Sequence, residues 1–155
     1  MPGFQIYKNL ASLNELNTAD AEALFLKCCG SDEWARRMEK ARPFALVEDL
    51  FASAEMTWGS VPPDSRLEAF QAEGMNGTSL LSSESEPNDE LAAVYHLYEE
   101  RFGFIFIVNS IGRSRNEITA ICRARLGNSA KTELIIAECE YDSIIRGRLK
   151  KLLER

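Results

Sequence analysis

Histidine, long apolar runs and closely spaced cysteines are what this sequence has least of. The chain contains one histidine, His96, and its longest apolar run is Phe104 to Val108. A bilayer-spanning helix needs about 20 apolar residues, so we expect no such helix. The first residues, MPGFQIYKN, lack the charged and then apolar layout of a signal peptide. We therefore expect a cytoplasmic protein that does not engage a membrane.

The cysteine pattern argues against a metal centre. Cys28, Cys29, Cys122 and Cys139 show no C-x-x-C spacing, and no histidine lies near them. Zinc sites depend on such spacings, so no metal is expected and the cysteines are interpreted as reduced core residues. With one histidine and no glycine-rich phosphate loop, the sequence also offers no nucleophilic triad and no nucleotide-binding motif.

Charge and length narrow the class of protein further. The formal net charge is −6, and 45% of the 155 residues are apolar. An acidic surface disfavours nucleic acid and anionic membranes as partners. A small anionic substrate stays compatible, because a few local arginines can override the net charge. The length and apolar content are those of one ordinary domain, so we expect residues 1–155 to form a single domain.

Apolar residues recur at helical spacing along most of the chain, between residues that commonly begin or end helices. We expect one compact all-α bundle of about seven or eight helices. Residues 104–108 have strand composition, but a lone strand has no partner, so no sheet is expected. The one long polar stretch, residues 74–88, is interpreted as either a functional or a disordered loop. The helices are expected near residues 17–30, 31–43, 47–59, 64–74, 88–103, from 114 onward, and from about 129 to the end.

Arg125 occupies a position where an apolar residue is expected. It follows Ile118 by seven residues and therefore falls on the inward stripe of its helix. A guanidinium keeps its charge in proteins, so an inward one needs an anionic partner. Arg125 is either a snorkelling or ion-paired structural residue, or a clamp for a substrate carboxylate or ureido oxygen. The residues alone favour the structural interpretation.

Three glutamates are the other candidate chemical groups. Glu84 and Glu86 lie among serines in the polar stretch, where a carboxylate either acts in catalysis or is merely solvated. Glu73 directly precedes a glycine and is equally compatible with the exposed end of a helix. His96 lies beside the apolar stripe of its helix, so we interpret it as a partly exposed residue.

A series of short phrases, in order along nearly the whole chain, resembles one known family. The two more specific phrases are Phe-Gly-Phe-x-Phe-Ile at 102–107 and Arg-Leu-x-Asn at 125–128. The other members of the set are Leu13-Asn14, Cys28-Cys29-Gly30-Ser31, Trp34-Ala35, Arg42-Pro43-Phe44, Leu67-Glu68-Ala69-Phe70, Tyr98, Gly112-Arg113-Ser114, Glu133, Ala137 and Arg148-Leu149. Together they resemble the 2-oxo-4-hydroxy-4-carboxy-5-ureidoimidazoline (OHCU) decarboxylases.

The resemblance implies an all-helical, cofactor-free and usually dimeric enzyme of urate breakdown. Members convert an unstable, anionic product of urate oxidation into (S)-allantoin with loss of carbon dioxide. Their site uses a histidine in His-Pro-x-x-Gly, a glutamate in Ser-x-x-Glu-Gln and an arginine in Arg-Leu-x-Asn. Backbone groups near the Phe-Ile run also hold the substrate. Arg125 matches the family arginine and Ile107 lies in that run, so the resemblance assigns both to substrate binding.

The match is incomplete at the other two phrases. Ser83 and Glu86 fit Ser-x-x-Glu, although Pro87 replaces the glutamine. The resemblance therefore assigns Ser83 to substrate binding and Glu86 to catalysis. After Ala72 the family would place histidine and proline, but this chain has Glu73 followed by glycine. Glu73 is thus the second expected catalytic residue.

The missing histidine matters because of the chemistry. Decarboxylation leaves an electron pair on an enolate-like ring, which must then receive a proton, and histidine suits that task near neutral pH. An ionised Glu73 would repel the substrate carboxylate, whereas a Glu73 kept protonated by burial can act as the acid. A proton-transfer group contributes about 10²- to 10⁴-fold in rate. We therefore expect either a working or weakened decarboxylase or a non-catalytic homologue that keeps the fold for small-molecule binding or protein interaction.

Overall fold

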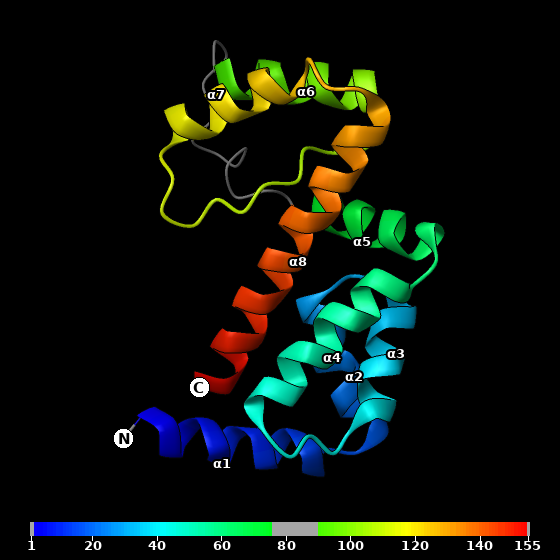
Figure 1. The fold of residues 1–155 in the computed structure, drawn as a ribbon, viewed down its shortest axis with the longest axis vertical. Helices are drawn as coiled ribbons and strands as arrows, with labels where there is room; N and C mark the ends of the chain where they lie inside the picture. Colours follow the sequence, from blue (N-terminus) through cyan, green and yellow to red (C-terminus); the bar gives the residue numbers. More distant parts are fainter. Residues whose placement is uncertain (1, 76–89, 155) are drawn as a thin grey trace. The chain divides into compact units, whose positions relative to one another are not determined.

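The computed structural model describes residues 2–75 and 90–154, with the side chains of residues 9–73 and 90–154. Within these ranges the chain forms eight α-helices and no strand, which confirms the all-α prediction (Figure 1). The helices are α1 (Pro2–Glu15), α2 (Thr18–Cys28), α3 (Asp32–Ala41), α4 (Val47–Ser60), α5 (Pro63–Met75), α6 (Glu90–Phe102), α7 (Arg115–Arg125) and α8 (Ala130–Glu154). None of these helices is long and apolar enough to cross a membrane.

The chain divides into two compact units. The first consists of Met1–Ala69 and Asp142–Arg155, and the second of Phe70–Tyr141. Helices α5 and α8 each contribute residues to both units. The single-domain organisation expected for residues 1–155 stays a prediction.

The core of the first unit is built around Trp34. The ring of Phe25 on α2 meets the Trp34 ring edge-on, with centroids 5.9 Å apart. The indole N–H of Trp34 donates to the carbonyl of Ala54 on α4 at 3.2 Å. Because its one polar group is paired, the large ring is buried without an orphaned donor. Ser31 begins α3 as predicted, since its Oγ accepts a hydrogen bond from the Trp34 N–H at 3.2 Å.

Helix α1 was not expected from the sequence, because its apolar stripe is short. Among its described side chains, only Leu10 and Leu13 are apolar and buried. Side chains from distant parts of the first unit hold it in place instead. The guanidinium of Arg42 donates to the Leu13 and Leu16 carbonyls at 2.7 and 2.8 Å. Asn9 donates to the carbonyl of Leu153, which joins α1 to the end of α8 (Figure 1).

The second unit has its apolar core between α6 and α7. Figure 1 shows these two helices lying side by side. The core residues come from both helices and from the segment between them: Leu91, Val94, Tyr95, Tyr98, Phe106, Val108, Ile118 and Cys122. Gly103 ends α6 with φ of +81°, a conformation that glycine adopts without a Cβ clash.

Residues 104–108, expected to form at most a short extended segment and no sheet, form neither helix nor strand, and the same holds on to residue 110. Side chains take the place of a partner strand. The Ile107 carbonyl accepts from the Arg125 guanidinium at 2.7 Å, and the Asn109 N–H donates to Glu140 at 3.2 Å. Buried backbone groups need partners, and here α7 and α8 supply them.

Two details of α5 differ from the sequence-based expectation. The helix begins at Pro63, so Asp64 lies in its first turn rather than at its cap. Proline is well suited to the first helical position, where its missing N–H costs nothing. The apolar spacing of α5 suggests that both Leu67 and Phe70 point inward, but Leu67 is 39% exposed and only Phe70 is buried.

Candidate functional site

Helix α7 carries Arg125 into the core of the second unit. Its N-cap is Ser114, whose Oγ accepts from the Glu117 N–H at 3.1 Å, as the sequence predicts. From that start, Ile118, Cys122 and Arg125 fall on one buried face at helical spacing. Arg125 is only 6% exposed, so the prediction that it points inward is confirmed.

The guanidinium of Arg125 is held from several directions. Its Nε–H donates to the carboxylate of Glu133, and its Nη1 donates to the carbonyl of Ile107 at 2.7 Å. The Nη2 group lies 3.4 Å from the hydroxyl of Tyr98. The guanidinium carbon also lies 4.4 Å from the centre of the Phe106 ring, a cation–π distance. Arg125 and Ile107, two of the three binding residues that the resemblance implies, are therefore in direct contact.

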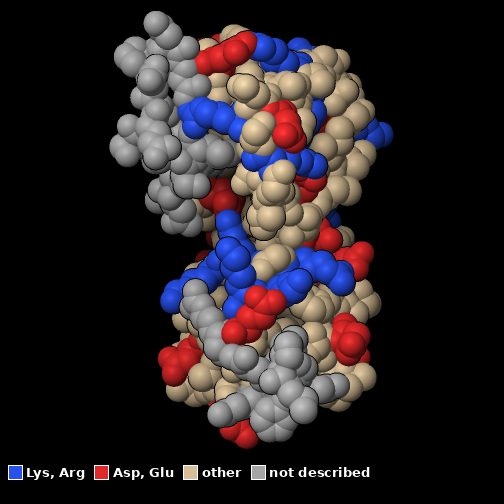
Figure 2. Space-filling model, turned by 90° about the vertical axis from the view of Figure 1, so that its left-hand side faces the viewer, with Lys and Arg blue, Asp and Glu red and all other residues tan. Residues whose placement is uncertain are grey.

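Glu133 is the second unusual charge of this cluster. On the face shown in Figure 2, acidic and basic side chains lie next to one another at the surface. Among the described residues, Arg125 and Glu133 are the charged side chains that are buried, and Glu133 has no exposed surface. Besides Arg125, its carboxylate accepts from the Tyr98 hydroxyl at 2.6 Å and from the Asn128 amide at 3.0 Å. A buried carboxylate with three donors is electrostatically satisfied.

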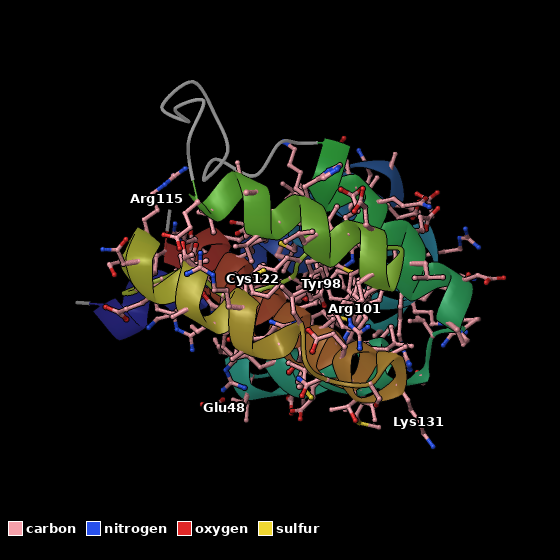
Figure 3. All side chains as sticks on the ribbon, turned by 90° about the horizontal axis from the view of Figure 1, so that it is seen from above. Glu48, Tyr98, Arg101, Arg115, Cys122 and Lys131 are labelled. Atoms are coloured by element: carbon pink, nitrogen blue, oxygen red, sulfur yellow. The ribbon has the colours of Figure 1, made fainter. Side chains whose placement is uncertain are left out.

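Tyr98 joins α6 to this ion pair. In Figure 3 it lies where α6 faces α7, close to Cys122. Burial raises the pKa of Tyr98 above its ordinary value, and the hydrogen bond to the Glu133 carboxylate raises it further. The phenol therefore keeps its proton at neutral pH and acts as a donor to Glu133. Burial likewise raises the pKa of the Cys122 thiol, to about 12, which keeps it uncharged.

The N–H groups of Arg125 that make no hydrogen bond within the cluster determine which ligand atoms the cluster can bind. The Nε–H, one Nη1–H and one Nη2–H have partners, whereas the second N–H of each terminal nitrogen has none within the part of the chain that the structure describes. Glu133 already compensates the guanidinium charge. The remaining donors therefore suit an uncharged or partly charged oxygen better than a second full carboxylate. The cluster is a preorganised donor pair of the kind that stabilises charge developing on an oxygen.

Glu73 lies on α5 in the same unit but in a different setting. It is half-buried, and the Tyr141 hydroxyl donates to its carboxylate at 3.4 Å. The Phe70 ring packs against the rings of Tyr141 and Phe104, with centroids 5.6 Å apart in both pairs. Among the described residues, those that bond to Arg125 do not include Glu73.

The remaining predicted site residues, Ser83, Glu84 and Glu86, lie outside the described residues. His96 is exposed beside Glu100 at 3.1 Å, as expected. Three of the cysteines, Cys28, Cys29 and Cys122, are buried as predicted, but Cys139 is exposed rather than in the core.

Sequence reasoning assigned no role in the site to Glu133, although a signal for it exists. Glu133 precedes Ala137, Tyr141, Ile145 and Leu149 at four-residue steps, and all of these are buried. A carboxylate on that stripe is as unusual as the arginine on the stripe of α7. Two opposite charges on inward-facing stripes, Arg125 and Glu133, together predict a buried ion pair.

The sequence profile of the OHCU decarboxylase family matches residues 14–77 and 72–150. A crystal structure of OHCU decarboxylase in the presence of (S)-allantoin is 32% identical, with a TM-score of 0.75, and the match covers 84% of this chain and 97% of that one. A crystal structure of (S)-allantoin synthase shares the fold at 16% identity and a TM-score of 0.74, covering 92% of this chain and 53% of that one.

A curated relative is the uric acid degradation bifunctional protein TTL of Arabidopsis thaliana, 29% identical over 145 residues, which are 81% of this chain and 45% of the relative. The chain thus spans about half the length of the curated relative that it matches. The two stretches of the profile match overlap at residues 72–77. Since the profile covers most of the sequence from residue 14 to residue 150, this chain belongs to the OHCU decarboxylase family.

Proposed function

We propose that this chain decarboxylates the ureidoimidazoline formed by urate oxidation, yielding (S)-allantoin, and that it does so more slowly than a member that keeps the histidine. One observation carries the proposal. The arginine of the Arg-Leu-x-Asn phrase is buried, anchored by Glu133 and Ile107, and retains two unused N–H donors. Such a donor pair is what an enolate-forming decarboxylation needs.

Arg125 is proposed to bind a ring or ureido oxygen of the substrate rather than the departing carboxylate. An ion pair with the carboxylate would stabilise the ground state, because that charge leaves during the reaction. Donors to the oxygen that gains charge stabilise the transition state instead. The carboxylate of Glu133 supports this choice, since it has already neutralised the guanidinium.

The resemblance supplies the roles proposed for the other residues. Glu86 is proposed to act in proton transfer, and Ser83 to bind substrate. Glu73 occupies the place of the family histidine, and its half-buried carboxylate next to the Tyr141 hydroxyl is the proposed substitute acid. We also propose that the protein is cytoplasmic, that it binds a small anionic substrate, and that it forms a homodimer, which light scattering in solution would test.

The test follows (S)-allantoin formation by circular dichroism. Urate oxidase and the hydrolase that follows it generate the labile substrate in situ. The wild-type chain should accelerate the reaction above spontaneous decay, and Arg125→Ala should lower kcat by about 10²-fold or more, as expected for an oxyanion donor. Arg123→Ala is the matched control, because Arg123 lies on the same helix with its side chain 52% exposed and should leave the rate unchanged.

A second variant tests the missing histidine. Glu73→His should raise the rate by about 10²- to 10⁴-fold if the rest of the site is intact, since it restores a proton-transfer group. A wild-type chain that gives no acceleration, with Glu73→His equally silent, would refute the proposed activity and leave the non-catalytic alternative.

A further inference from the structure

Tyr95 is a buried tyrosine whose hydroxyl makes no hydrogen bond to any described residue. It lies on α6 within the core of the second unit and is 7% exposed. Its hydroxyl oxygen is fully buried and has no hydrogen-bond partner among the described residues. Tyr98 and Tyr141, the fully buried tyrosines of the same unit, both donate to glutamates. Tyr95 is therefore the exception among the buried phenols of this unit.

An unpaired buried hydroxyl destabilises the native state, because the group has lost water without gaining a partner. Phenylalanine would fill the same space without that penalty. Groups of this kind persist where they serve binding or catalysis. The position of Tyr95 shows which site it can serve.

Tyr95 and Arg125 contact the same aromatic ring. The Tyr95 ring centroid lies 5.3 Å from that of Phe106, and the guanidinium carbon of Arg125 lies 4.4 Å from the Phe106 centroid. The Tyr95 hydroxyl is also near enough to the Arg125 guanidinium for that charge to act on the pKa of its phenol, which it lowers. Two groups that flank one ring and interact electrostatically belong to one local environment.

The chemistry of Tyr95 makes it a donor. Burial raises the pKa of its phenol above the ordinary value, and the opposing influence of Arg125 is smaller. The hydroxyl thus keeps its proton at neutral pH. Like the two N–H groups of Arg125 that have no hydrogen-bond partner among the described residues, it can donate a hydrogen bond to an oxygen.

We propose that the Tyr95 hydroxyl is a ligand-binding group of the Arg125 site, donating a hydrogen bond to an oxygen of the ureido compound bound there. The proposal rests on the proposed function for the identity of the ligand. It adds a residue that the family phrases do not include.

The experiment compares Tyr95→Phe with the wild-type chain in two measurements. Isothermal titration with (S)-allantoin should show binding weakened by about 5- to 100-fold, the usual loss when one donor to a buried oxygen is removed. Without ligand, the melting temperature should stay the same or rise by up to about 4 °C, because an unpaired hydroxyl has been removed. Tyr98→Phe is the matched control, and it should lower the melting temperature because Glu133 loses a donor.

The outcomes separate this inference from the proposed function. Weaker (S)-allantoin binding by Tyr95→Phe supports the inference even if the wild-type chain accelerates no decarboxylation. Equal binding by the variant and the wild-type chain overturns it even if the wild-type chain is active. Failure of the wild-type chain to bind (S)-allantoin also overturns it. A Tyr95→Phe variant that melts markedly lower or does not fold contradicts it too, because the hydroxyl would then have a structural partner.

Discussion

Replacing Glu133 by alanine should destabilise this protein more than a typical core substitution. The change leaves the Arg125 guanidinium buried with its charge uncompensated, and it removes the acceptor for Tyr98 and Asn128. Breaking a buried ion pair from one side costs about 3–5 kcal/mol. A domain has about 5–15 kcal/mol of stability in total, so about a fifth or more of it is at risk.

The assay is urea unfolding followed by far-UV circular dichroism, with the change in the free energy of unfolding taken from the midpoint. The same loss corresponds to a fall in melting temperature of about 6–20 °C for a chain of this size. Glu133→Gln should lose less, because glutamine keeps the volume and one acceptor oxygen. Glu100→Ala is the surface control, since its side chain is 63% exposed beside His96 and should change stability by no more than about 0.5 kcal/mol.

A double variant decides whether the cost comes from the orphaned charge. Arg125→Leu combined with Glu133→Leu replaces the whole pair by apolar side chains, which is often neutral or even stabilising. It should therefore be more stable than Glu133→Ala alone. Two results would refute this account of the cluster. One is a loss of unfolding free energy below about 1 kcal/mol in Glu133→Ala. The other is a double variant whose loss equals the sum of the losses in Arg125→Leu and Glu133→Leu measured separately.

Two further predictions concern other parts of the chain. Gly103→Ala should lower the free energy of unfolding by about 1–2 kcal/mol, because φ of +81° strains an alanine, whereas Gly59→Ala within α4 should raise it in the same urea assay. Asp142→Asn should raise the melting temperature at pH 7 but not near pH 3, because burial, and then the charge of Glu55, raise the pKa of the Asp142 carboxyl in the folded chain. An acid whose pKa is raised in the folded chain lowers stability as the pH rises above its unfolded pKa, and the full cost is present above its folded pKa. Removing the Asp142 carboxyl should therefore help at pH 7 and not near pH 3. Equal gains at both pH values would contradict this.

The sequence predicts the helices and the burial of Arg125 because both depend on local spacing. Seven of the eight helices follow from apolar stripes and capping residues such as Ser31 and Ser114. The inward position of Arg125 follows from its distance to Ile118 along one helix. These features are decided within a few turns, where periodicity is informative.

The partners of Arg125 depend on contacts that the local pattern does not contain. Tyr98 and Glu133 are 35 residues apart, and Ile107 and Arg125 are 18 apart. On α8 the periodicity points to Leu134 as inward, but the buried residue is its neighbour Glu133. A shift of one position on a helix changes the face by about 100°, and only the packing of α8 against the arginine decides it.

The anchoring of Arg125 by Glu133 has a consequence for how this lineage can change. Because loss of the arginine would strand a buried carboxylate, the needs of folding preserve it whether or not the reaction is under selection. The presence of this arginine in a relative is therefore a poor marker of activity, and position 73 is the better one. If Arg125 is the binding residue that we propose, the same constraint keeps that part of the site in place, and a substitution at position 73 could speed catalysis without rebuilding it.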